Sequence, residues 1–145
     1  MQISTRFTIA VHTLLCIEHF DGQLKTTSSF IAGSVNANPV VIRRILGQLK
    51  DAGFIEVAAG VGGAHMARPL SEITLLDVFN AVEAVDGPLF DFHNDPNPSC
   101  PVGRNVHAVL DDKLANAQRA LETSLAKTTL ADLECELDAK LENEA

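Results

Sequence analysis

The sequence predicts a mainly α-helical fold: a winged helix-turn-helix with a two-stranded β wing, followed by a long helix and a short terminal helix. Three observations predict this class. A strongly amphipathic segment follows a short helical one after a brief turn at residues 36–39. A glycine-rich hairpin pattern comes next, at residues 54–68. A single apolar stripe then runs through residues 106–125, which contain no Gly or Pro.

The composition suits a folded protein with one domain and an appended element. The chain has 145 residues, of which 46% are hydrophobic, enough to build a core. Charged and histidine side chains interrupt the first twenty residues, which argues against a signal peptide, and no stretch is apolar enough to cross a bilayer. Three cysteines at wide spacings do not describe a disulfide framework. We therefore expect a cytoplasmic protein with no membrane partner.

The charge is distributed unevenly along the chain. The net charge is -8. Residues 1–69 carry six basic and four acidic residues, a net charge of +2, and the remainder carries five basic and fifteen acidic residues, a net charge of -10. Because DNA phosphates are contacted by one local surface, the overall acidity does not exclude a nucleic-acid partner.

Two helices, the second of them short, are predicted ahead of the turn at residues 36–39. Residues 3–20 place apolar side chains at steps of three and four, and Asp21-Gly22 ends this helix. Residues 26–29 are Thr and Ser, which offer N-caps to a second helix that the turn at residues 36–39 interrupts.

The third helix and the hairpin complete the predicted DNA-binding unit. Pro39 suits the first position of a helix that Gly53 ends. Its apolar side chains fall at i, i+3, i+4 and i+7: Ile42, Ile45, Leu46 and Leu49. Residues 54–58 then predict a strand, residues 60–63 a turn and residues 64–68 the returning strand of a wing.

The rest of the chain is predicted to form one more short helix, a loop and two further helices. Thr74 and Asp77 have capping-box spacing at the start of the fourth helix. Residues 86–103 hold four prolines and predict a functional loop. Thr129 and Asp132 repeat the capping pattern ahead of the last helix.

The long helix between the loop and the last helix needs a partner for its stripe. The stripe consists of Val106, Leu110, Leu114, Ala117, Leu121 and Leu125. A second copy of the same helix would bury it, which predicts a two-fold homodimer. Packing of the helix on its own domain remains an alternative. The predicted organisation is a DNA-binding domain at 1–85, a sensor-type loop at 86–103, and a dimerisation helix with a C-terminal helix at 104–145.

The segment 51–87 carries a family resemblance. With its Gly62-Gly63 wing, Ala67-Arg68-Pro69 and the run from Ile73 to Val78, it resembles the IscR/NsrR/CymR family of bacterial winged-helix repressors. The resemblance continues through Cys100-Pro101-Val102-Gly103 and covers nearly the whole chain. It implies a dimer that binds a partly palindromic operator and carries a sensor loop ahead of its dimerisation helix.

The outward side of the third helix supplies the candidate base contacts. If the apolar side points inward, Val40, Arg43 and Arg44 point outward. Arginine can donate two hydrogen bonds to guanine, and a good bidentate pair contributes about 1 to 3 kcal/mol of discrimination. Asn38 is suited to contact the edge of an adenine base, and Val40 is suited to contact the methyl group of a thymine. A solvated arginine face is the alternative.

Other candidate residues are expected to contact the DNA backbone. Ser28 and Ser29, at the start of the second helix, are expected to bind phosphate. Gly62, Gly63 and His65 of the wing are expected to approach the sugar-phosphate backbone, since two glycines leave little bulk. For His65, a purely structural place in the hairpin is nearly as plausible.

The cysteines bear on cofactors and sensing. Several relatives hold an iron-sulfur cluster with three cysteines of the loop at 86–103, but here this loop contains only Cys100. Thr8 stands where some relatives place a carboxylate ligand, and Cys16 and Cys135 lie elsewhere in the sequence. We therefore expect no cluster and no other cofactor. A metal site made from Cys100, His93 and His107 fits no defined zinc pattern.

Cys100 remains a candidate redox or thiol sensor, because a thiolate in an exposed loop oxidises reversibly. The alternative is an ordinary residue in a degenerate sensor loop. No catalytic motif occurs, so we expect no enzyme. The sequence predicts a homodimeric repressor that binds double-stranded operator DNA specifically. The alternative is a winged-helix protein-interaction module that recruits a metabolic enzyme and binds DNA little or not at all.

Overall fold

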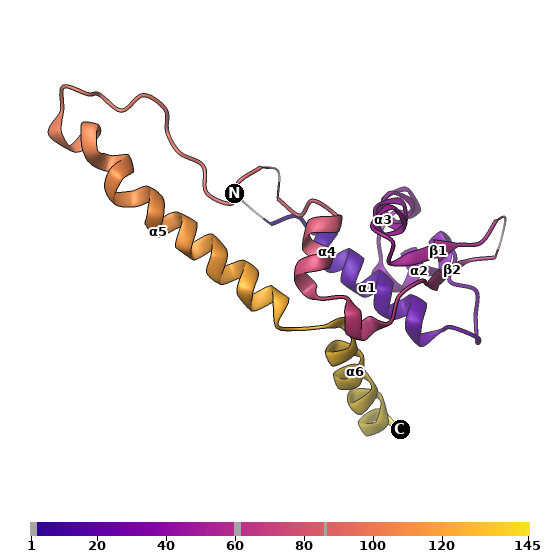
Figure 1. Ribbon diagram of the computed structural model, residues 1–145. Helices are drawn as coiled ribbons and strands as arrows, with labels where there is room; N and C mark the ends of the chain where they lie inside the picture. Colours follow the sequence, from indigo (N-terminus) through magenta and orange to yellow (C-terminus); the bar gives the residue numbers. More distant parts are fainter. Residues whose placement is uncertain (1–2, 60–61, 86) are drawn as a thin grey trace.

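The computed structural model describes residues 3–59, 62–85 and 87–145 (Figure 1). It confirms the mainly helical winged-helix class. The elements are α1 (Arg6–His19), α2 (Ser28–Val35), α3 (Pro39–Asp51), β1 (Ile55–Val57), β2 (Ala64–Met66), the 3-10 helix η1 (Leu70–Glu72), α4 (Leu75–Ala81), α5 (Pro101–Ala126) and α6 (Leu130–Glu144). None of the helices described is long and apolar enough to cross a membrane.

The core lies between the first four helices and the wing. On α3 the four predicted inward residues are all buried: Ile42, Ile45, Leu46 and Leu49. They pack with Leu14 and Ile17 of α1 and Ile31 of α2. The apolar period of α3 therefore fixes which side of this helix faces away from the protein.

The first helix begins later than predicted, at Arg6 instead of residue 3. The backbone N–H of Ser4 donates to the carbonyl of Ala84 at 2.8 Å, which draws the start of the chain toward the end of α4. Arg6 strengthens this contact, because its Nε donates to the carbonyl of Val82 at 3.2 Å and its Nη2 to that of Glu83 at 2.6 Å. A long-range contact thus determines where α1 begins.

The wing is a two-stranded antiparallel sheet. Val57 pairs with Ala64 and Ile55 with Met66. Both strands are shorter than predicted, although the N–H of Ala67 still donates to the carbonyl of Phe54 at 2.9 Å beyond their ends. Of the predicted turn, residues 60 and 61 lie outside the described residues.

Both predicted capping boxes are confirmed. The Thr74 hydroxyl accepts from the N–H of Asp77 at 3.1 Å, and the Asp77 carboxylate accepts from the N–H of Thr74 at 2.9 Å. Thr129 and Asp132 form the same pair of bonds at 3.2 and 2.9 Å. The two helix starts lie side by side, since Thr74 and Thr129 form an antiparallel bridge. This bridge joins α6 to the winged-helix domain.

The long helix α5 extends away from the winged-helix domain (Figure 1). It has 26 residues, and none of them is buried. It begins at Pro101, so the last three residues of the predicted loop are helical; Asp86 lies outside the described residues. Proline is well suited to the first helical position, and a Cβ on Gly103 would lie 2.5 Å from the carbonyl oxygen of Asn97. The glycine in this first turn therefore allows the loop to approach the helix closely.

Candidate nucleic-acid interface

The outward side of α3 carries the predicted cationic residues. Arg43 and Arg44 are exposed, and Val40 is 60% exposed. Within the described ranges, neither guanidinium has a hydrogen-bond or ion-pair partner in the protein. Because the opposite side of α3 is buried in the core, this exposed ridge can enter a DNA groove without any rearrangement of the fold.

Asn38 has a structural task in addition to its predicted DNA contact. It is the N-cap of α3, and its Oδ1 accepts from the backbone N–H of Val40 at 2.9 Å. The cap fixes the side chain at the start of the helix and engages its acceptor oxygen. The amide NH2 group remains available to donate a hydrogen bond to a base or a phosphate.

The start of α2 faces the same region. Thr27, one of the four predicted N-cap candidates, is the N-cap, and its hydroxyl accepts from the N–H of Phe30 at 3.2 Å. Ser28 is half-buried and Ser29 is exposed. The two predicted phosphate-binding serines therefore occupy the first turn of α2, and the backbone N–H groups at the start of a helix favour the binding of an anion.

A groove of about 390 Å³ connects α2, α3 and the wing. It brings Ser28 together with Arg43, and Gly63 lies on its wing side. Lys50 also lines it and adds a second cation that the sequence analysis missed. The helical period could have found Lys50, because it lies seven residues after Arg43 on the same side of the helix. No carboxylate is among the described residues that line this groove.

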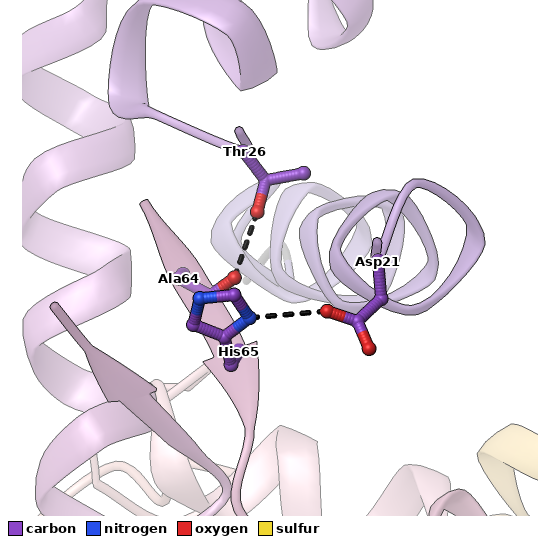
Figure 2. Close-up of polar contacts among 4 residues, drawn as sticks. All are labelled: Asp21, Thr26, Ala64 and His65. Atoms are coloured by element: carbon purple, nitrogen blue, oxygen red, sulfur yellow. Dashed lines mark hydrogen bonds and ion pairs between the residues drawn. The ribbon is translucent and has the colours of Figure 1, made fainter. Parts of the chain in front are cut away.

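The connection between α1 and α2 holds the wing in place (Figure 2). The Thr26 hydroxyl donates to the carbonyl of Ala64 at 2.8 Å, and the N–H of Ala64 donates to the carbonyl of Thr26 at 3.1 Å. Next to them, Nδ1 of His65 lies 3.0 Å from Oδ1 of Asp21. This clamp, formed by Asp21, Thr26, Ala64 and His65, gives His65 a structural partner, although its side chain stays 55% exposed.

The two wing glycines are required by packing. Gly63 has φ +78°, and a Cβ there would lie 3.0 Å from the backbone nitrogen of Thr26. A Cβ on Gly62 would lie 2.4 Å from the Cβ of Ala58. Their predicted approach to the DNA backbone stays a prediction, since the hairpin itself already accounts for both residues.

We expect Thr26→Val to destabilise the protein by about 1–3 kcal/mol, because the Ala64 carbonyl loses its hydroxyl donor at a buried position. Chemical denaturation followed by circular dichroism measures the change. The matched control is Thr8→Val, at an exposed position of α1, which should shift the free energy of unfolding by no more than about 0.5 kcal/mol. Equal stabilities for the two variants would contradict a clamp at Thr26.

The three cysteines lie on three different elements. Cys100 is the exposed N-cap of α5, Cys16 is buried in α1, and Cys135 is exposed on α6. The backbone N–H groups of Gly103 and Val102 lower the pKa of the Cys100 thiol. The predicted helix begins after Gly103, three residues too late to place Cys100 at its N-cap.

The two histidines considered for a metal site belong to other contacts. The rings of His93 and His107 stack at 6.1 Å, and Nδ1 of His107 lies 3.0 Å from Oδ1 of Asp111. In the part of the chain that the structure describes, no group of three or more His, Cys, Asp or Glu side chains is placed to hold a metal ion.

A recognition helix with exposed arginines, a wing clamped beside it and a basic groove between them define a winged-helix transcription regulator, a class that is not enzymatic. The chain belongs to the Rrf2 family, described as iron-dependent transcriptional regulators, whose family model matches residues 3–136. This family membership confirms the resemblance found in the sequence.

Individual relatives agree with this assignment. The chain is 41% identical over 132 residues to YwnA of Bacillus subtilis, a candidate HTH-type transcriptional regulator, covering 91% of this chain and 96% of YwnA. It is similar to a crystal structure of a candidate DNA-binding protein, with 36% identity, a TM-score of 0.69, and 88% and 97% of the two chains covered. It also shares the fold of CymR, the global cysteine regulator of B. subtilis, with 20% identity, a TM-score of 0.67, and 94% and 98% covered.

The cysteines do not fit the iron-sulfur cluster that some relatives hold. Thiolate ligands of one cluster must converge on a few ångströms of space. Here Cys16, Cys100 and Cys135 belong to α1, the start of α5 and α6, and Cys16 points its sulfur toward Ser34 of α2. The donor set of this chain therefore does not match a cluster built from three loop cysteines.

Proposed function

We propose that this protein is a homodimeric repressor that binds operator DNA specifically, with α3 of each protomer in the major groove. The observation that carries the proposal is the cationic ridge of Arg43 and Arg44, exposed and without a protein partner in the described ranges. The groove with Arg43 and Lys50 supports phosphate contacts on either side of the bases. Since bacterial chromosomal DNA lies in the cytoplasm, the proposal includes that location.

The surface of α5 supports the dimer. Val102 is 73% exposed and Val109 is 67% exposed, and no residue of the helix is buried. Together with Val106, Leu110 and Leu114 they lie on one side of the helix, at successive steps of four, three, one and four residues. A second copy of α5 covers this side and presents two recognition helices to a palindromic site, which is the usual symmetry of such regulators.

The experiment that tests DNA binding uses the purified full-length protein. Genomic fragments that it retains are sequenced, and the affinity for an enriched fragment is measured over a range of salt concentrations. We expect one enriched motif with two-fold symmetry, an affinity that falls steeply with salt, and lower transcription from a promoter that carries the motif. No enriched motif and a flat salt dependence would favour a protein-interaction module instead.

We further propose that Cys100 senses thiol-reactive or oxidising compounds and that the protein works without an iron-sulfur cluster. The lowered pKa of Cys100 supports the first part, because the thiolate is the reactive form. The scattered cysteines support the second part. Iron analysis of the protein purified without oxygen checks it, and a stoichiometric iron content would contradict it.

We expect iodoacetamide to alkylate Cys100 faster than Cys135 at neutral pH, although both thiols are exposed. A lowered pKa means that the Cys100 thiolate already forms at a lower pH, so its rate should reach half of the maximum below the pH at which an ordinary cysteine thiol ionises. Mass spectrometry of the two cysteine peptides over a pH series measures both rates.

The regulatory role of Cys100 needs its own control. Operator affinity is compared before and after diamide or peroxide treatment, in the parent protein and in Cys100→Ser. We expect only the parent to change its affinity. Identical responses of the two proteins would eliminate Cys100 as the sensor.

A further inference from the structure

An apolar groove between α1, α2 and α6 has no part in the DNA contacts proposed above. Its volume is about 480 Å³, which is within the range of small-molecule sites. Apolar side chains form most of its walls: Val11 and Leu15 from α1, Phe20 at the C-cap of α1, and Leu137 and Leu141 from α6. A ligand that fills this groove must therefore be small and largely apolar.

Three of the polar residues that line this groove are hydrogen-bonded to one another. The Cys16 thiol donates to Oγ of Ser34 at 3.4 Å, and Oγ of Ser34 lies 2.9 Å from Nε2 of His12. Cys16 is only 6% exposed, yet it lines the groove. With the Ser34 hydroxyl donating to Nε2, the arrangement connects a nucleophile to a base through one hydroxyl.

We propose that this groove binds small apolar α,β-unsaturated carbonyl compounds and that Cys16 captures them covalently. The apolar walls of the groove select the carbon skeleton of such a compound, and the thiol of Cys16 supplies the nucleophile. The groove opens to solvent beside α6, where Leu141 is 36% exposed, so a ligand has a way in. A thiol that served packing alone would not need a hydrogen-bonded connection to a base such as His12.

The reaction is an addition in which nothing is oxidised or reduced by another reagent. The thiol proton passes to Ser34 while the Ser34 proton passes to Nε2 of His12. The sulfur lone pair forms a bond to the β-carbon, and the π electrons of the double bond move toward the carbonyl oxygen. The resulting enolate takes a proton at the α-carbon from protonated His12 or from water, which leaves a thioether. No leaving group departs.

The position of Ser34 connects this site to DNA, a step that rests on the proposed function. Ser34 is on α2, which packs directly against both α1 and the recognition helix α3. An adduct on Cys16 removes the thiol bond to Ser34 and fills the space between α1 and α2. We therefore expect the adduct to displace α2, and α3 with it, and to lower operator affinity.

The test uses full-length protein in which Cys16 is the only cysteine, C100S/C135S, with a C16A/C100S variant that keeps only Cys135 for comparison. Each reacts with 1-octen-3-one, an apolar α,β-unsaturated ketone, and with acrylamide, a polar compound that adds to thiols in the same way. We expect the preference for octenone, measured by intact mass, to be at least about tenfold larger at Cys16 than at Cys135.

Two variants test whether the reactivity of Cys16 depends on the groove and on the hydrogen bonds that connect Cys16 to His12 through Ser34. The alternative is that only the exposure of the thiol matters. His12→Asn should slow the reaction of Cys16 and remove the contribution of His12 from its pH profile. Leu141→Glu should abolish the preference for octenone, whereas Ala139→Glu, an exposed neighbour that does not line the groove, should keep it. Reaction of Cys16 only after unfolding in urea, or equal rates in the parent, His12→Asn and Leu141→Glu, would overturn the proposal.

Operator affinity of the adduct is measured separately, on a fragment enriched from genomic DNA. We expect at least about a tenfold loss of affinity. An adduct that forms but leaves this affinity unchanged would overturn the regulatory part. Because the adduct is scored by mass, failure of the protein to bind any DNA would contradict the proposed function and would leave the covalent site standing.

Discussion

We expect the double variant R43A/R44A to lose sequence-specific DNA binding while keeping the melting temperature of the parent protein. Both arginines are exposed on α3, and the side of α3 that stabilises the fold is the opposite one. If each arginine contributes about 1–3 kcal/mol to recognition, the loss is about 2–6 kcal/mol, or roughly 30-fold to 20,000-fold in affinity. A gel shift on an enriched fragment, with differential scanning fluorimetry in parallel, measures both quantities.

Two further substitutions make this result specific. Arg119→Ala removes an exposed arginine from α5, outside the proposed DNA-binding surface, and should leave affinity unchanged. Lys50→Ala removes a cation from the basic groove and should weaken binding to all sequences alike, with a shallower salt dependence. Full specific affinity in R43A/R44A would rule out α3 as the reading helix.

The second large effect concerns α5. The double variant V109E/L110E should convert the proposed dimer to a monomer, because it places two carboxylates without partners in the apolar contact proposed between two copies of the helix. We expect the dimer dissociation constant to rise by at least about 100-fold. Sedimentation velocity and light scattering measure the oligomeric state.

The fold of each protomer should survive this change, since Val109 is 67% and Leu110 is 36% exposed in the chain itself. Ala115→Glu adds the same kind of charge at an exposed position on the other side of α5 and should leave the dimer intact. Binding to a full palindromic operator should fall with dimer formation. A V109E/L110E variant that remains a dimer would show that α5 does not carry the interface.

Local patterns predicted most of the fold correctly. The capping boxes at Thr74 and Thr129 depend on residues only three positions apart, so the sequence alone specifies them. The two sides of α3 follow from its apolar period in the same way. Where α1 begins was predicted wrongly, because a contact with the distant end of α4 decides it.

The contacts that build the candidate sites could not be predicted from local sequence patterns. The bond between Thr26 and Ala64 joins residues 38 positions apart, and that between His65 and Asp21 joins residues 44 positions apart. No periodicity or motif signals such pairs. The same holds for the contact between His12 and Ser34, so the groove beside Cys16 emerged only from the three-dimensional arrangement. The charge on Lys50 was visible in the sequence, but its place in the groove depended on the wing.

The length of α5 limits how a signal at Cys100 can travel. A helix of 26 residues spans about 39 Å, and its first turn lies at the end remote from the winged-helix domain of the same protomer (Figure 1). If Cys100 is the proposed sensor, its oxidation acts far from the recognition helix of its own protomer. In the proposed dimer, it would instead change the angle between the two protomers and, with it, the distance between the two half-sites that the dimer can span. Operators with altered spacing would then distinguish the reduced from the oxidised protein.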